Sequence, residues 1–226
     1  MPTHTRVGAV HALLASIDTT QAAFERGWPE ADVAHLLDGS LYLDRSRGTA
    51  DEAEIARRIA RLIEHSAATG AEGILFTGSF FGPAVRAARK LVTVPVLTSF
   101  DGIIDSALAL DAPLAVVSTA TDSARYLADE VSGEGRSRGR EPSVTTHVVD
   151  GAMDALIGGD SAAHDRMVLD AVTALSGDSA VLIAQFSMER VIVEAQAAAS
   201  SPVLGTATEG AALLREVLSG NKPAPR

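Results

Sequence analysis

Two stretches of the chain repeat each other: "ILFTGSFFGPAVRAARKLVTVPVLTS" at 74–99 and "VLIAQFSMERVIVEAQAAASSPVLGT" at 181–206. They align without a gap at an offset of 107 residues, and "VPVL" falls on "SPVL". Each stretch reads as an apolar strand, a turn with small or polar residues, a helix and a second apolar strand. A repeated unit of this kind predicts a fold built from two copies of the same arrangement.

Two more pairs of segments match in the same order along the chain. They are "VGAVHA" (7–12) with "LAVVST" (114–119), and "HLLDGSL" (35–41) with "HVVDGAM" (147–153). Three matches in one order indicate a duplication. We therefore predict an N-terminal domain of residues 1–98 plus 207–226 and a C-terminal domain of residues 99–206.

Short apolar runs alternate with helical patterns in both halves. The predicted strands are 6–12, 32–38, 73–77, 94–98, 113–119, 143–150, 180–185 and 202–206. Most are continuously apolar, as expected for parallel strands that are covered on both faces. The clearest helix is 51–69, with acidic residues in its first turn and Gly70 after its end. The pattern predicts an α/β fold with two pseudo-symmetric, Rossmann-like domains and mostly parallel sheets.

Ligands of open α/β sheets bind beyond the carboxyl ends of the strands. The repeat places the turns 77–80 and 184–187 at such ends, and it makes Gly78 and Gln185 equivalent positions. We expect these turns to face each other across an active site in the interdomain cleft.

Composition excludes several classes of function. The 226 residues carry a net charge of −10 and a pI near 5.0, which disfavours nucleic acid and membrane surfaces as partners. There is no cysteine, so disulfides and thiol nucleophiles are excluded. The sequence shows no signal peptide and no run of about 18 apolar residues, which predicts a cytoplasmic protein. Metal-binding and dinucleotide motifs are absent, and we predict no metal and no cofactor.

Several motifs together resemble the aspartate/glutamate racemase superfamily, which includes hydantoin racemases, maleate isomerases and arylmalonate decarboxylases. They are "VHALLASIDTTQAAFERGWPEADVAHLLDGSLYLD" (10–44), "ILFTGSFFGP" (74–83), "STATDSA" (118–124), "GDSAAHDRM" (159–167), "VLIAQFSM" (181–188) and "SPVLGTATEG" (201–210). The resemblance covers nearly the whole chain. It implies two pseudo-symmetric α/β domains with the active site between them, and a homodimer is a possible assembly because members are often dimers.

Typical racemases of the superfamily carry a cysteine at the end of the third strand of each half, and the two thiols exchange a proton on opposite faces of the substrate. In this sequence the two positions hold Gly78 and Gln185. Neither glycine nor an amide exchanges a proton near neutral pH, so the two-thiol mechanism is excluded. Arylmalonate decarboxylases also have glycine at the first position, followed by hydroxyl residues. Ser79 fits that pattern and Phe80 departs from it, but their protonating cysteine is replaced here by Gln185.

The resemblance also implies which turns hold the substrate carboxylate. Carried over by position, the substrate-binding candidates are Gly78, Ser79, Phe80, Thr119, Thr121, Ser123, Gln185, Phe186 and Ser187. The serine and threonine side chains have the alternative role of helix caps. Gly78 either satisfies a backbone requirement or opens space for a larger substituent. Gln185 either donates a hydrogen bond to an oxyanion or fills the site without binding.

With the thiols gone, acid–base groups have to come from other strand ends. His11 ends the first strand and titrates near neutrality, and Asp38 ends the second. The alternatives are a buried structural histidine and an Asp-Gly turn. The favoured function is a cofactor-independent isomerase, lyase or decarboxylase acting on a small carboxylic acid through an enolate-like intermediate. The alternative is a catalytically inactive protein that binds a small carboxylate.

Overall fold

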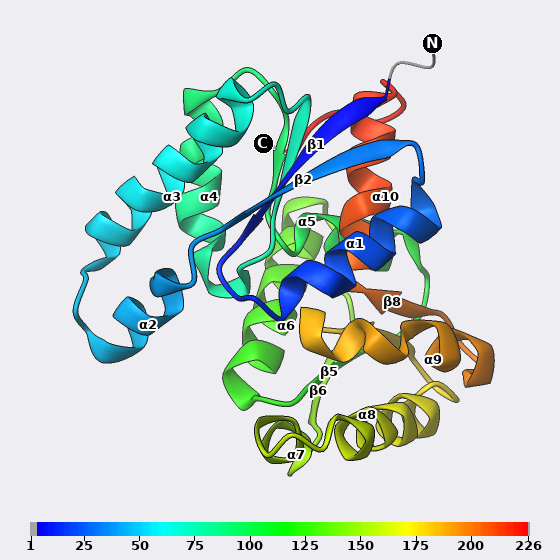
Figure 1. Ribbon diagram of the computed structural model, residues 1–226. Helices are drawn as coiled ribbons and strands as arrows, with labels where there is room; N and C mark the ends of the chain where they lie inside the picture. The colour runs from blue at the N-terminus through cyan, green and yellow to red at the C-terminus, as the bar shows by residue number, and fades with distance from the viewer. Residues whose placement is uncertain (1–3, 226) are drawn as a thin grey trace. The chain divides into compact units, whose positions relative to one another are not determined.

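The computed structural model describes residues 4–225, and it forms two compact α/β units (Figure 1). Unit 1 comprises Met1–Gly102 and Gly210–Arg226, and unit 2 comprises Ile103–Glu209. The boundaries fall inside two helices, α5 (Asp101–Ala109) and α10 (Thr206–Leu218).

Each unit contains one four-stranded, fully parallel sheet. In unit 1 the order is β2-β1-β3-β4, from β1 (Thr5–His11), β2 (Ala31–Leu37), β3 (Gly73–Phe76) and β4 (Val96–Leu97). In unit 2 the order is β6-β5-β7-β8, from β5 (Leu114–Ser118), β6 (Val144–Val148), β7 (Ala180–Ile183) and β8 (Val203–Gly205).

The register of the strands repeats with the sequence. Ile74 pairs with Val96 in unit 1, and the residues 107 positions later, Val181 and Val203, pair in unit 2. The same strand order and register in both halves confirm the predicted α/β class with two related parallel sheets.

Helices cover the sheets in the usual βαβ manner. Unit 1 contains α1 (Ser16–Gly27), α2 (Ser40–Arg47), α3 (Glu52–Ala68), η1 (Ser79–Phe81), α4 (Gly82–Ala88) and η2 (Arg89–Leu91). Unit 2 contains α6 (Thr121–Ser137), α7 (Ala152–Ile157), α8 (Ser161–Leu175), η3 (Phe186–Val191) and α9 (Ile192–Ala198).

The predicted helix 51–69 is α3, and its sequence explains its limits. Asp51 is the N-cap, and its carboxylate accepts a hydrogen bond from the Glu54 N–H. Ile55, Ile59 and Ile63 recur every fourth residue and are fully buried against the sheet.

All eight predicted strands are present, but some are shorter than predicted. The strand predicted at 94–98 is only Val96–Leu97. It ends at Leu97 because the next N–H, that of Thr98, donates to the Asp101 carboxylate at the start of α5. Within residues 4–225 no helix is long and apolar enough to cross a membrane.

Candidate functional site

His11 lies at the carboxyl end of β1, completely buried in a polar cluster of unit 1. Its Nδ1 is 2.9 Å from Thr77 Oγ1 and 3.1 Å from Ser16 Oγ. Its Nε2 is 2.8 Å from Nδ1 of His35, on the neighbouring strand β2. The structure therefore brings together side chains from β1, β2, the end of β3 and the start of α1.

The hydrogen bonds fix the proton positions along this cluster. Gln21 donates its amide N–H to Glu25, so its carbonyl oxygen accepts from Nε2 of His35. A neutral His35 then accepts at Nδ1, and the His11 Nε2–H donates to it. His11 Nδ1 is left as an acceptor for the Thr77 hydroxyl, since Ser16 donates to the Leu13 carbonyl. Both ring nitrogens of His11 are thus engaged.

The spacing of Thr77, His11 and His35 resembles that of a hydroxyl nucleophile, a base and a group that orients the base. The electrostatics differ from those of a catalytic triad. Burial and the neighbouring His35 lower the pKa of His11 to about 4, whereas a carboxylate in the third position would raise it. His11 is therefore a neutral and weakly basic imidazole at pH 7.

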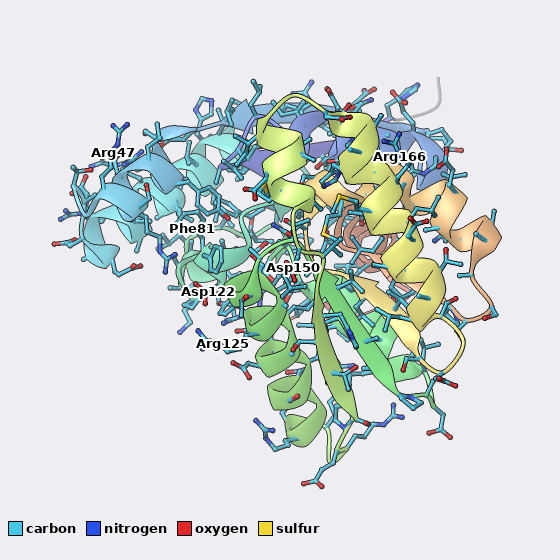
Figure 2. All side chains as sticks on the ribbon, turned by 90° about the horizontal axis from the view of Figure 1, so that it is seen from below. Arg47, Phe81, Asp122, Arg125, Asp150 and Arg166 are labelled. Carbon is cyan, nitrogen blue, oxygen red and sulfur yellow. The ribbon has the colours of Figure 1, made fainter. Side chains whose placement is uncertain are left out.

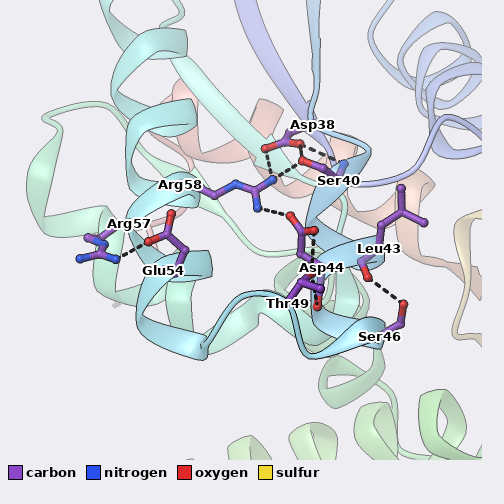
Figure 3. A network of polar contacts seen from close by, with 9 residues as sticks. All are labelled: Asp38, Ser40, Leu43, Asp44, Ser46, Thr49, Glu54, Arg57 and Arg58. Atoms are coloured by element: carbon purple, nitrogen blue, oxygen red, sulfur yellow. Dashed lines mark hydrogen bonds and ion pairs between the residues drawn. The ribbon is translucent and has the colours of Figure 1, made fainter.

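Asp38 follows β2 and is held in a network with Arg58 of α3 (Figure 3). One carboxylate oxygen accepts from the N–H and hydroxyl of Ser40, and the other accepts from Arg58 at 2.8 Å. Burial raises the pKa of Asp38, but the hydrogen bonds from Ser40 and Arg58 outweigh it and leave the pKa lowered. Asp38 is an ionised carboxylate with both oxygens bonded, and it joins α2 to α3. Its repeat partner Asp150 is exposed (Figure 2).

Gly78 is required by close packing rather than by backbone conformation. Its φ of −102° and ψ of 103° are accessible to any residue. A Cβ at this position would lie 2.6 Å from a ring carbon of Phe81 and 2.7 Å from one of Phe76. Both rings are buried. Neither alternative for Gly78 fits this geometry: the backbone does not require glycine, and no space is open at the Cβ position, because ring atoms of Phe81 and Phe76 lie beside it.

The turn after Gly78 is already in contact with Tyr42, a side chain that was not among the predicted site residues. Burial raises the pKa of Tyr42 to about 12, while backbone hydrogen bonds from Phe80 and Ser79 lower it in part. The third N–H of the turn, that of Phe81, donates to the Gly78 carbonyl. Tyr42 is thus a neutral phenol that is hydrogen-bonded to the backbone of a turn predicted to hold the substrate carboxylate. A cavity of about 280 Å³ beside it is lined by Tyr42, Arg45, Ser46, Glu52 and Phe80.

Gln185 occupies the position in unit 2 that Gly78 has in unit 1, and its side chain is fixed. Its Oε1 accepts three hydrogen bonds: from Thr119 N at 2.7 Å, Thr119 Oγ1 at 2.8 Å and Ser118 Oγ at 2.9 Å. An N–H can only donate, so the Thr119 N–H decides which end of the amide is the oxygen. Ser118 is completely buried and Thr119 nearly so.

The other predicted residues of unit 2 lie near the ends of β5 and β7. Thr121 and Ser123 are in the first turn of α6, which has no side-chain cap; Thr121 is exposed and Ser123 is buried. The Phe186 side chain is in the core, so only its backbone is available to a ligand. Ser187 is half-buried in η3.

A family model described as Asp/Glu/hydantoin racemase matches residues 17–180, well over half of the sequence. The chain belongs to the Asp/Glu/hydantoin racemase family. Comparison with curated proteins finds no significant match.

Solved structures of racemases and a decarboxylase share the fold. An allantoin racemase from Klebsiella pneumoniae is 16% identical, with a TM-score of 0.74 over 98% of this chain and 90% of that one. Glutamate racemase isoform RacE1 from Bacillus anthracis is 10% identical, with a TM-score of 0.63 over 98% and 84%. An arylmalonate decarboxylase is 15% identical, with a TM-score of 0.67 over 97% and 96%. The Asp/Glu/hydantoin racemase family is one of enzymes, and this chain is a member of it.

Three contributors to the site were not predicted from the sequence: Thr77, Ser118 and Tyr42. Thr77 and Ser118 directly precede predicted residues, and the repeat pairs Ser118 with His11, so this signal was present in the sequence. Tyr42 lies on α2, inside the quoted segment 10–44, but nothing in the sequence singled it out from its neighbours. Within residues 4–225 no group of three or more His, Cys, Asp or Glu side chains is placed to hold a metal ion.

Proposed function

We propose that this member of the racemase family is a cofactor-independent enzyme that acts on a small carboxylic acid by isomerisation, elimination or decarboxylation without thiol chemistry. The observation that carries the proposal is the pair of thiol positions. Gly78 is closed by two aromatic rings, and Gln185 is held by three hydrogen bonds. A rigid hydrogen-bonding amide replaces a proton-transferring group at the second position.

Fixed donors suit a reaction in which negative charge develops on an oxygen of the substrate. Donors that are already oriented stabilise such charge without reorganising, and in many enzymes this stabilisation contributes more to the rate than any other effect. The N-terminus of α6, a helix of 17 residues without a side-chain cap, adds a favourable dipole beside Thr119.

His11 and Asp38 are assigned to positioning in this proposal. His11 has a pKa of about 4 and no free ring nitrogen, and both oxygens of Asp38 are bonded. In this arrangement the proton that moves during the reaction comes from the substrate or from water. Substitution of either residue is then expected to change stability more than the pH dependence of turnover.

The test is a panel of small carboxylic acids incubated with the protein in D₂O without added metal or cofactor. Proton NMR follows deuterium entry at the α-carbon, loss of a carboxyl group and migration of a double bond. The exposed-surface variant Arg125→Ala serves as the control for preparation artefacts. Turnover of one acid by the wild type and by Arg125→Ala supports the proposal. Saturable binding without any conversion contradicts it.

The second candidate is a binder of small carboxylates without turnover. Its support is that polar groups of both predicted turns already have hydrogen-bond partners within the protein. The backbone of Ser79 and Phe80 is bonded to Tyr42, and Gln185 Oε1 accepts from Thr119. Saturable binding with no exchange across the whole panel is the result that selects this candidate.

A further inference from the structure

The polar groups of Ser118 and Thr119 form a three-donor seat for one oxygen atom. One backbone N–H and two hydroxyls converge at 2.7–2.9 Å on the same acceptor, Gln185 Oε1. The Ser118 hydroxyl also accepts from the Ala120 N–H at 3.1 Å, so its proton is directed to Gln185. This is the donor arrangement of a site for a carboxylate oxygen, but a protein side chain fills it.

The occupied seat decides which atom of Gln185 is available to a ligand. With Oε1 held by the seat, the Nε2 amino group is turned away from it. Within residues 4–225 Nε2 has no hydrogen-bond partner, and the residue is only partly buried. A donor group with two hydrogens is therefore presented at the end of β7, where the repeat has Gly78 in unit 1.

From this we infer that Gln185 is a specificity-determining residue that binds an oxygen of the substrate carboxylate through Nε2, and that Ser118 and Thr119 position Gln185 instead of contacting the substrate. The inference rests on the proposed carboxylate-binding function. It reassigns Thr119 from a direct contact to a positioning residue.

Substitutions at 185 and 119 separate the two arrangements. Gln185→Glu keeps an oxygen in the seat but replaces the donor amino group by a second, negatively charged oxygen. It is expected to weaken binding of acetate and malonate by at least about tenfold in NMR titrations, since a hydrogen bond to a charged group is lost. Thr119→Val removes one of three anchors and is expected to weaken binding by only about two- to fivefold.

Thr173→Val is the matched control, because it removes a threonine hydroxyl that donates to a helix carbonyl on α8. Affinity for malonate should not change in this variant. If Thr119→Val abolishes binding while Gln185→Glu retains it, the threonine is the direct contact and the inference is wrong. If the wild-type protein binds neither acetate nor malonate, the proposed carboxylate-binding function is wrong together with the inference. That result differs from binding that persists in Gln185→Glu, which contradicts only the inference.

A second measurement tests the seat itself. In Gln185→Ala the three donors lose their acceptor, and acetamide or acetate restores an oxygen at that place. Acetamide should raise the melting temperature of Gln185→Ala and leave that of the wild type unchanged, whereas acetate should raise both, because the wild type binds it through Gln185. An equal shift in both proteins with acetamide, or none in the variant, contradicts a preformed seat.

Discussion

Burial of His11 makes unit 1 sensitive to mild acid. The folded-state pKa of about 4 lies below the ordinary value of 6.5. Above pH 6.5 the ring is neutral in both the folded and unfolded chain, so protonation does not affect stability. Below it the unfolded chain binds a proton that the folded chain does not, so the free energy of unfolding falls until the pH reaches about 4.

The size of the effect follows from the two pKa values. A difference of one pKa unit corresponds to about 1.4 kcal/mol, so the full loss between pH 7 and pH 4 is about 3 kcal/mol. At pH 5, where carboxylates still contribute little, the expected loss is about 2 kcal/mol. Burial lowers the pKa of His35 as well, and this adds a loss of the same sign.

Urea unfolding at pH 7 and pH 5 measures this loss. The single tryptophan, Trp28, is buried in unit 1 and reports on the unit that contains His11. His11→Asn lowers stability at pH 7 because it disrupts the buried hydrogen bonds, but it should remove most of the difference between the two pH values. His4→Asn, at a half-exposed side chain, is the matched control for loss of a histidine. An undiminished difference in His11→Asn would refute the reasoning, as would a His11 NMR titration centred near pH 6.5.

Three further predictions concern close packing and a largely buried ion pair. Gly78→Ala should lower the free energy of unfolding by about 1–3 kcal/mol, because the added Cβ overpacks against Phe81. Adding Phe81→Met, which introduces the residue found at the equivalent position 188, should recover part of the loss. Additive costs of the two substitutions in a double-mutant cycle would contradict a contact between positions 78 and 81. In Gly205→Ala the new Cβ clashes with the buried Glu189 carboxylate, which accepts from N–H groups in the first turn of α10. The melting temperature of this variant should therefore be several degrees lower than that of the wild type. Arg89→Met removes the cation of a largely buried ion pair but leaves the hydrogen bond from the Thr98 N–H to the Asp101 carboxylate, so it should cost up to about 3–5 kcal/mol. Arg125→Met, in an exposed pair on α6 (Figure 2), should cost less than about 1 kcal/mol, and equal denaturation midpoints for the two variants would argue against the difference in burial.

The repeat made much of the fold readable from the sequence alone. Strands β3, β5 and β7 are buried along their whole length and almost entirely apolar, so they stood out. The edge strands β2 and β6 contain no buried residue, and their match to each other in the repeat marked them instead. The same offset of 107 residues then appeared in the strand register, from Ile74 with Val96 to Val181 with Val203. Strand ends were less well predicted, since contacts such as Thr98 with Asp101 end a strand through a residue three positions away.

The sequence by itself also showed that this chain has no cysteine at the two thiol positions of the family, because that observation needs no coordinates. Only the tertiary structure decided what replaced the thiols. Rings of Phe76 and Phe81 closed the space at Gly78, and two residues of a neighbouring strand end turned Gln185 into an oriented donor. The contacts of Gln185 join side chains that are far apart in the sequence. A local sequence pattern does not determine which side chains come into contact.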